Sequence, residues 1–255
     1  MIDLHCHILP RVDDGAKDLE ESLEMARLAV SEGITHILAT PHHQNKMWMN
    51  DKQKVQTLVS ELQVALNEQN IPLTVFPGQE VRLYGELLKD IKEGTIQFID
   101  EGNQYLLLEF PTSQVPAYTE RLFFQLESKG VTPIIVHPER NRVFLKEPER
   151  LKELVDKGAL AQLTAASYTG GFGKEIQKFS KQLIEANLVH FIASDAHNTQ
   201  NRSFHMQEAM QLLKKEYGQQ TVDQYNQLTK DIVNGEWAYP QPAQSIRKKK
   251  RFGLF

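Results

Sequence analysis

The sequence predicts an α/β fold, specifically a distorted TIM-like (β/α)7 barrel that forms one domain over residues 1–255. Two observations predict it. Short apolar runs alternate with longer amphipathic segments from end to end, which is typical of strand and helix units around a parallel sheet. The unusual polar residues stand almost all at the C-terminal end of a run, where barrel active sites are built. Alternation alone would also fit an open doubly wound sheet.

Seven apolar runs are the strand candidates: Ile2 to His5, Ile37 to Thr40, Leu73 to Phe76, Tyr105 to Phe110, Val131 to Val136, Leu160 to Thr164 and Val189 to Ala193. Between them, segments such as Leu19 to Val30 and Val55 to Leu66 place apolar residues at helical spacing, with Glu and Lys on the other face. The chain has no internal repeat, no Ser/Gly linker and no break in composition, so one barrel is favoured over two domains.

The composition excludes several classes of protein. A chain of 255 residues with 40% hydrophobic residues can bury a sizeable core, and a formal charge of -4 gives no general attraction to nucleic acid. No apolar run approaches the ~18 residues that cross a bilayer, so stable membrane insertion is not expected. The single Cys6 excludes an internal disulfide, and the first residues lack a signal-peptide pattern, which together predict a cytoplasmic protein.

The C-terminal tail, residues 243–255, is the one strongly basic segment, with Arg247, Lys248, Lys249, Lys250 and Arg251 in succession. A solvated chain end is the simpler interpretation. The alternative is a weak contact with anionic lipid or an acidic partner, since each basic residue near anionic lipid contributes ~1 kcal/mol.

The first candidate metal ligands are His5 and His7 at the end of the first run. Residues two apart on an extended chain point to the same side, so both imidazoles can meet one ion. The pair Asp13-Asp14 follows before Gly15, and spacing alone does not decide which of the two is a ligand. Cys6 points to the other side of the strand, which predicts a core position.

Further candidates follow the next runs. Pro41 prevents a helix and leaves His42 and His43 in a loop, where we favour His42 as a ligand and His43 as a substrate contact or a partner of a ligand. Glu80 follows the third run and Glu109 closes the fourth. A carboxylate after several apolar residues is costly to bury unless a cation satisfies it; the alternative is a structural Glu paired with Arg.

The fifth run delivers His137 and Arg140, and the seventh delivers Asp195 and His197, with Arg202 five residues later. Most strand ends thus carry His, Asp or Glu, the usual ligands of zinc, manganese or iron. By contrast, His36 and His190 stand at strand starts and are predicted to be structural, and His205 on a predicted helix is left undecided.

Nine ligand candidates exceed what one ion can use, so two or three ions are implied, with a bridging carboxylate. Closely spaced ions suit hydrolysis at phosphorus, because one activates water while another stabilises charge on the oxygens. Arg140 and Arg202 could each grip a phosphate, or could be ordinary ion-pair partners.

The segments His5-Cys6-His7, Thr40-Pro41-His42, Gly78-Gln79-Glu80, His137-Pro138-Glu139-Arg140 and Ser194-Asp195-Ala196-His197 resemble the polymerase-and-histidinol-phosphatase (PHP) superfamily over nearly the whole chain. The opening residues 1–16 and the segment 137–141 are similar to the tyrosine-protein phosphatases encoded with bacterial capsule and exopolysaccharide genes, the CpsB/YwqE type.

The resemblance implies a seven-stranded barrel of the PHP fold with three divalent ions, usually manganese, with iron or zinc as alternatives. It implies hydrolysis of phosphotyrosine on a bacterial tyrosine autokinase, which regulates exopolysaccharide or capsule synthesis. Arg140 and Arg202 would hold the phosphoryl group during in-line attack by water, without a phosphoenzyme. The implied ligand sets are His5, His7, Glu80 and Asp195 for one ion; Glu80, Glu109 and His137 for a second; and Asp14, His42 and His197 for the third. Many relatives have His where Glu109 stands, and a carboxylate there favours manganese or iron over zinc.

Three other functions stay open on the sequence. A phosphatase for a small molecule such as histidinol phosphate would use the same ligands. An amidohydrolase also opens with His-x-His, but that class commonly bridges its metals with a modified Lys, whereas Glu80 and Glu109 stand in the candidate places here. A metal-stabilised interaction module without catalysis would leave the arginines and the surplus ligands unexplained.

Overall fold

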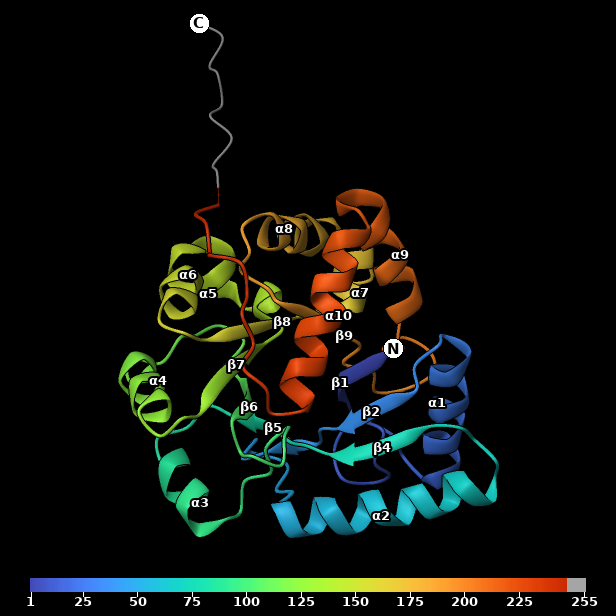
Figure 1. The fold of residues 1–255 in the computed structure, drawn as a ribbon. Helices are drawn as coiled ribbons and strands as arrows, with labels where there is room; N and C mark the ends of the chain where they lie inside the picture. Colours follow the sequence, from blue (N-terminus) through green and yellow to red (C-terminus); the bar gives the residue numbers. More distant parts are fainter. Residues whose placement is uncertain (247–255) are drawn as a thin grey trace, which may run out of the picture.

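The computed structural model describes residues 1–246, so the predicted role of the basic run 247–251 lies outside the described residues. Helices surround a set of parallel strands (Figure 1). The strands are β1 (Ile2–Cys6), β2 (His36–Ala39), β3 (His42–His43), β4 (Thr74–Pro77), β5 (Glu80–Arg82), β6 (Tyr105–Glu109), β7 (Thr132–Val136), β8 (Leu160–Thr164) and β9 (Phe191–Ala193). The helices are α1 (Leu19–Ser31), α2 (Lys52–Glu68), α3 (Leu87–Glu93), α4 (Thr119–Glu127), the 3-10 turn η1 (Pro138–Arg140), α5 (Arg142–Lys146), α6 (Glu149–Asp156), α7 (Ala165–Thr169), α8 (Lys174–Glu185), α9 (Met206–Tyr217) and α10 (Gln219–Val233).

The strands form two hydrogen-bonded sheets, β1-β2-β4 and β3-β5-β6-β7-β8-β9, in which every pairing is parallel. Two residues separate β2 from β3, and two separate β4 from β5. A parallel bridge joins Cys6 at the end of β1 to Ala196 just after β9. The architecture is therefore a mixed α/β fold around a curled, half-barrel parallel sheet.

All seven predicted runs lie on strands, and the helices predicted over Leu19 to Val30 and Val55 to Leu66 are α1 and α2. The prediction that His42 and His43 stand in a loop is wrong, because they form β3 and pair with β5 at Glu80 and Val81. Strands of two or three residues carry no detectable alternation of their own. They form because the neighbouring strand offers hydrogen bonds, which local sequence does not reveal.

Both long helices near the N-terminus begin at an aspartate. The Asp18 side chain accepts a hydrogen bond from the Glu21 N–H at the start of α1, and Asp51 accepts from the Lys54 N–H at the start of α2. A side-chain oxygen at this position satisfies a backbone donor that the helix itself cannot pair. These caps fix where α1 and α2 begin, and so they set where the loops that precede the two helices end.

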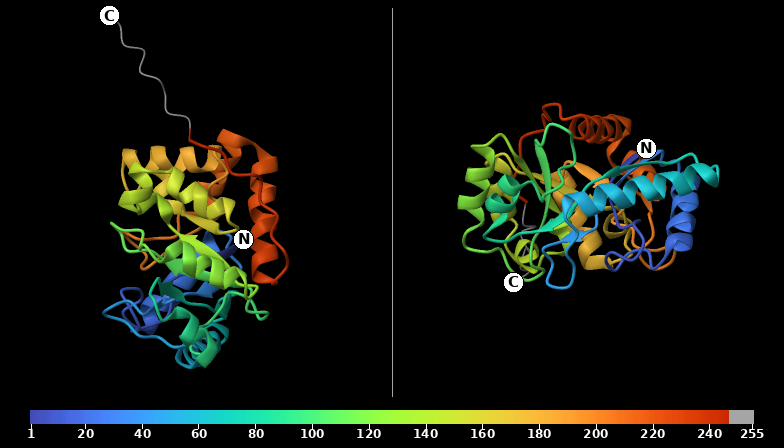
Figure 2. Two further views of the ribbon diagram at one scale, coloured as in Figure 1. Left: turned by 90° about the vertical axis from the view of Figure 1, so that its left-hand side faces the viewer. Right: turned by 90° about the horizontal axis from the view of Figure 1, so that it is seen from below.

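The core has two parts. A large apolar cluster fills the space between the strands and the outer helices, and it includes the fully buried Cys6, as predicted. A smaller cluster inside the curl combines Leu4 of β1, Tyr105 of β6 and Phe191 of β9 with Ile232 of α10. Tyr105 and Phe191 are the first residues of their strands, so α10 covers the N-terminal end of the sheet (Figure 2). The carboxyl ends of the strands are left for the polar residues.

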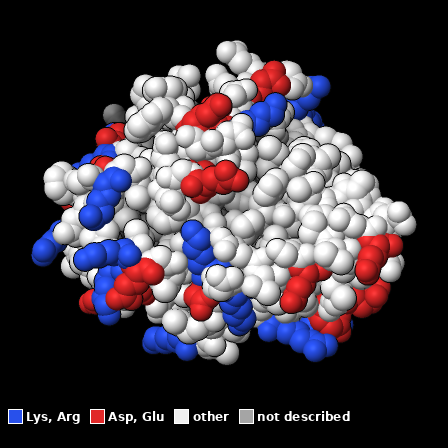
Figure 3. Space-filling model, turned by 60° about the horizontal axis from the view of Figure 1, so that its bottom comes forward, with Lys and Arg blue, Asp and Glu red and all other residues white. Residues whose placement is uncertain are grey.

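The surface carries charges of both signs. On the face shown in Figure 3, basic and acidic side chains are interspersed, and neither forms a continuous surface there. Within residues 1–246, none of the helices combines the length and the apolar character that crossing a membrane requires.

Candidate active site

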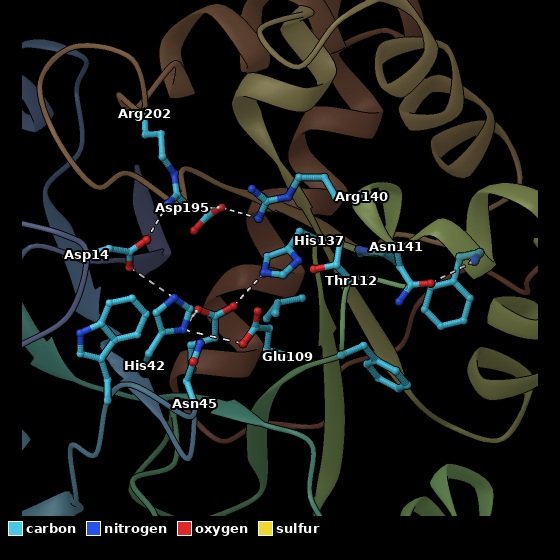
Figure 4. Close-up of a pocket in the computed structure, with 16 residues that line it drawn as sticks. Asp14, His42, Asn45, Glu109, Thr112, His137, Arg140, Asn141, Asp195 and Arg202 are labelled. Atoms are coloured by element: carbon cyan, nitrogen blue, oxygen red, sulfur yellow. Dashed lines mark hydrogen bonds and ion pairs between the residues drawn. The ribbon is translucent and has the colours of Figure 1, made fainter. Parts of the chain in front are cut away.

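The structure brings all nine predicted metal ligands to the carboxyl ends of the strands. Six of them line a cavity of about 310 Å³ (Figure 4): Asp14, His42, Glu80, Glu109, His137 and Asp195. Their positions follow the strands: His5 and His7 at the end of β1, His42 on β3, Glu80 on β5, Glu109 closing β6, His137 after β7, Asp195 and His197 after β9, and Asp14 in the loop before α1. Residues separated by almost the whole chain thus lie together at the carboxyl ends of the strands.

The backbone is unusual at two of these positions. His137 has φ 37° and Asp195 has φ 54°, a left-handed conformation that non-glycine residues seldom adopt. The Asp195 N–H donates to the His5 carbonyl at 2.8 Å, which ties this conformation to β1. Backbone strain of this kind costs on the order of 1–3 kcal/mol and gathers at functional sites.

The end of β1 also departs from regular pairing. The register between β1 and β2 shifts between Asp3 and Cys6. Such an irregularity redirects side chains next to active sites. Within this segment, Leu4 joins the apolar cluster inside the curl and the adjacent His5 belongs to the polar cluster.

Three groups of side chains place potential ligand atoms within 4.8 Å of one another: His5, His7 and Glu80; His42, Glu80 and Glu109; and His7, Asp14, His42 and His197. Asp195 adds to the first group, because its Oδ1 lies 3.5 Å from Nε2 of both His5 and His7. His137 contacts the other oxygen of Glu80, with Nε2 at 2.7 Å from Oε1. Glu80 therefore belongs to the first two groups and also contacts His137, while His42 is shared by the second and third groups.

The orientation of the imidazoles fits metal ligation. Nδ1 of His7 donates to Asp13 Oδ2 at 2.7 Å, and Nδ1 of His197 donates to the Asp195 carbonyl at 2.8 Å. Because these oxygens cannot donate, each imidazole carries its proton on Nδ1 and turns the lone pair of Nε2 toward the cluster. Ligating histidines in metal sites are held in this way by an oxygen on their far nitrogen.

The two aspartates that spacing left open make different contacts. Asp13 contacts His7 on Nδ1 and belongs to none of the three groups, and it also accepts the backbone N–H groups of Gly15 and His42. Asp14 directs Oδ1 at Nε2 of both His42 and His197, each at 3.4 Å. The turn requires Gly15, since a Cβ there would lie 2.1 Å from the His7 carbonyl oxygen.

Several buried polar atoms have no hydrogen-bond partner among the described residues. They include Oε2 of Glu109 and Nε2 of His197, together with Oε2 of Glu80 and Nδ1 of His42, which lie 2.8 Å apart as an ion pair without the geometry of a hydrogen bond. All four atoms face the cluster. Leaving one buried polar atom unpaired costs about 1–3 kcal/mol, and native proteins seldom tolerate several together. Divalent cations would satisfy all four atoms, so the residues present fit a metal centre.

The electrostatics support the same conclusion. Burial acts to raise the pKa of Glu80, but the charges of His42 and His5 outweigh it and hold that pKa well below its ordinary value. For Glu109, burial and then the charge of Glu80 raise the pKa. Two carboxylates this close are both ionised only when further positive charge is present.

Glu109 also has an arginine partner, as expected if it were a structural Glu paired with Arg. Arg82 Nη1 lies 2.7 Å from Glu109 Oε1, while Oε2 stays unpaired and faces Glu80 and His42. Glu109 can therefore be both a metal ligand and an ion-pair partner of Arg82, because Oε1 contacts Arg82 and Oε2 faces the cluster.

Two arginines line the cavity (Figure 4). Arg140 Nη2 lies 2.5 Å from Asp195 Oδ2, and Arg202 Nη2 lies 3.6 Å from the same oxygen. Arg202 Nη1 also contacts Asp14 Oδ2 at 3.0 Å. Both guanidiniums thus converge beside the ligand cluster, where they could bind an anion.

The remaining predicted histidines lie elsewhere. His43 is 2% exposed and is not among the residues that line the cavity, so the geometry does not support a substrate contact. Adjacent strand residues point to opposite faces, and His42 takes the face toward the cluster. His190 is buried and its Nδ1 accepts the Ala161 N–H, His36 stacks on Phe76, and His205 precedes α9.

Sequence reasoning missed the residues that support the ligands. Gln162 Oε1 accepts from His5 Nδ1 at 3.0 Å, and Asp3 accepts both the N–H and the hydroxyl of Ser194. The side chains of Gln162 and Asp3 are fully buried. A polar residue inside an apolar run was the available signal, because such a residue needs a partner.

Comparisons with known proteins agree with this site. A family model described as capsular polysaccharide synthesis, CpsB/CapC, matches residues 1–230. The chain is 45% identical over 255 residues to the tyrosine-protein phosphatase YwqE of Bacillus subtilis, covering 100% of both chains. It is 28% identical over 223 residues to the tyrosine-protein phosphatase CpsB of Streptococcus pneumoniae, covering 86% of this chain and 91% of that protein.

A solved structure from work on YwqE of Bacillus subtilis and CpsB of Streptococcus pneumoniae, which are described there as metal-dependent tyrosine phosphatases, matches with a TM-score of 0.94. Its sequence is 45% identical, and the match covers 97% of this chain and 100% of that chain. The chain therefore belongs to the CpsB/CapC family of capsular polysaccharide synthesis proteins.

Proposed function

We propose that this protein is a metal-dependent protein-tyrosine phosphatase. The observation that carries the proposal is the cluster of His and carboxylate side chains whose potential ligand atoms lie within 4.8 Å of one another in three groups, beside two convergent arginines. The identity of 45% to YwqE and 28% to CpsB, both tyrosine-protein phosphatases, supports the same reaction. The substrate class is a phosphotyrosine protein.

Three divalent ions are part of the proposal, with manganese as the expected metal and iron or zinc as alternatives. Their ligands would be His5, His7, Asp14, His42, Glu80, Glu109, His137, Asp195 and His197, with Glu80 as the bridging carboxylate. When bound, such ions activate water and neutralise charge that develops on the phosphoryl oxygens. Glu109 in place of a nitrogen ligand favours manganese or iron over zinc.

Arg140 and Arg202 would bind the phosphoryl group. Guanidinium groups match the geometry of phosphate oxygens, and they stabilise charge without moving during the reaction. The P–O bond to the tyrosine breaks as a P–O bond to water forms, and the tyrosine leaves as a phenolate that takes up a proton. Cys6 takes no part as a nucleophile, since it is fully buried in the large apolar cluster.

A finer description of the fold belongs to the same proposal. If β2 continues as β3 and β4 as β5, the chain has seven strands. The bridge between Cys6 and Ala196 would then close them into the distorted (β/α)7 barrel of the PHP fold. We also infer one domain over residues 1–255 and a cytoplasmic location, where the substrate would be a bacterial tyrosine autokinase that controls capsule or exopolysaccharide synthesis.

The test compares phosphate release from a phosphotyrosine peptide and from histidinol phosphate, after chelation and re-addition of manganese. Manganese-dependent release from the peptide alone is the expected result. Preference for histidinol phosphate would instead make this a small-molecule phosphatase, and release from neither compound would refute the proposed reaction.

A further inference from the structure

A short loop with apolar side chains stands next to the cavity, residues 44–49 between β3 and α2. At its base, the Trp48 N–H donates to the Asn45 carbonyl at 2.7 Å. On either side of Trp48, Met47 is 77% exposed and Met49 is 59% exposed. Exposed methionines are common on surfaces that adapt to a bound partner.

The loop is anchored rather than loose. The buried Asn50 that follows it donates to the His42 carbonyl at 2.8 Å and to the Val12 carbonyl at 3.0 Å. In turn, the Gln79 side chain donates to the Asn50 carbonyl at 2.6 Å. The loop is therefore tied to the same strands that carry the metal-ligand candidates.

Trp48 connects this loop with the site. Its side chain lines the cavity together with Arg140 and Arg202. The indole stacks on the imidazole of His42, with 5.3 Å between the centroids and 12° between the planes. Stacking on His42 therefore helps to fix the orientation of the indole at the wall of the cavity.

We propose that Trp48 is the residue that recognises the aromatic ring of the substrate, and that Met47 and Met49 contact peptide residues next to the phosphotyrosine. The inference rests on the proposed function, because it places the phosphoryl group between Arg140 and Arg202. The phenyl ring then extends toward the loop and packs against the indole. Aromatic pairs favour each other beyond the area that they bury.

This arrangement makes the loop a determinant of specificity. A phosphoserine side chain has no ring, so it gains nothing from the indole. The other role that Trp48 could have is to hold His42 in place. Loss of that support would weaken the reaction of every phosphate ester equally, so the ratio between an aryl and an alkyl substrate separates the two roles.

The first experiment measures turnover of a phosphotyrosine peptide, phenyl phosphate and a phosphoserine peptide by manganese-loaded wild type, Trp48→Leu and Trp48→Phe. We expect Trp48→Leu to lose about tenfold in kcat/KM on both aryl substrates relative to the phosphoserine peptide, mainly through KM. Trp48→Phe should retain most of the aryl preference. The double variant Met47→Ser, Met49→Ser should raise KM for the phosphotyrosine peptide and not for phenyl phosphate.

The second experiment does not depend on turnover. The chain has two tryptophans, so Trp237→Phe leaves Trp48 as the single fluorophore. Trp237 is 66% exposed and does not line the cavity, which makes this variant the matched control for activity as well. Phenylphosphonate should change the Trp48 emission and bind about tenfold more tightly than methylphosphonate.

Two results would overturn the inference. An equal loss on aryl and alkyl esters in Trp48→Leu would assign the indole to support of His42, and equal binding of the two phosphonates would remove it from recognition. If the wild type fails to hydrolyse the phosphotyrosine peptide, the proposed reaction is refuted, while the phosphonate titration still decides whether the indole contacts an aryl group.

Discussion

Asp13 offers a sharp test of how the site is held, because it contacts the ligands without facing the cluster. Its Oδ2 accepts from His7 Nδ1 at 2.7 Å and from the His42 N–H at 3.0 Å, and its Oδ1 accepts from the Gly15 N–H at 2.9 Å. Asp13→Asn keeps the shape of the side chain but turns one of these two acceptors into an NH₂ donor. If the NH₂ group takes the place of Oδ2, it faces the donors of His7 and His42; if it takes the place of Oδ1, it faces the Gly15 N–H.

The magnitude follows from these contacts. A hydrogen bond to a charged group contributes about 1.5–3 kcal/mol, and a buried donor without an acceptor costs about 1–3 kcal/mol. In His7, the proton on Nδ1 would lose the carboxylate that keeps Nε2 free for a metal. We expect the affinity for manganese to fall by about 10- to 100-fold, with turnover largely restored at saturating metal.

Manganese titration of the chelated protein, followed by calorimetry and by phosphatase activity, measures this effect. Asp18→Asn is the matched control, since it makes the same chemical change at the cap of α1, where asparagine serves equally well. Asp14→Asn should differ, because loss of a direct ligand would lower turnover even at saturating metal. An unchanged manganese affinity in Asp13→Asn would refute the reasoning.

The remaining predictions concern catalysis, metal and acid stability. His137→Ala and Asp195→Ala should each abolish turnover while circular dichroism stays native, and full activity in either would contradict the site. Arg140→Ala should lower kcat about 10²- to 10³-fold, which steady-state kinetics would check against Arg140→Lys. Manganese at about 100 times its Kd should stabilise the chelated protein by about 2.7 kcal/mol, and a denaturant midpoint that does not move would contradict a metal centre. Burial lowers the pKa of His190 to about 4, so the unfolded chain binds this proton first as the pH falls below about 6.5, and stability decreases through that window. His190→Asn keeps an acceptor for the Ala161 N–H but cannot titrate. Between about pH 7 and about pH 5, the free energy of unfolding of this variant should therefore fall by about 2 kcal/mol less than that of wild type, as measured by urea unfolding.

The sequence alone was sufficient for the residue types of the site and for the order of the strands. His5, His137 and Asp195 each stand where an apolar run ends, and the carboxyl ends of parallel strands meet at one edge whatever the details of packing. The alternation of apolar runs and amphipathic segments is a local property, so it can be detected without knowing which segments touch.

The tertiary structure decided which atoms meet. The different contacts of Asp13 and Asp14, the absence of His43 from the cavity lining and the irregular register of β1 all depend on neighbours far along the chain. So does the position of Trp48 against His42, which depends on how the loop is anchored. Sequence periodicity records which face of a segment is apolar, whereas hydrogen bonds and ion pairs form between particular atoms only after distant strands have paired.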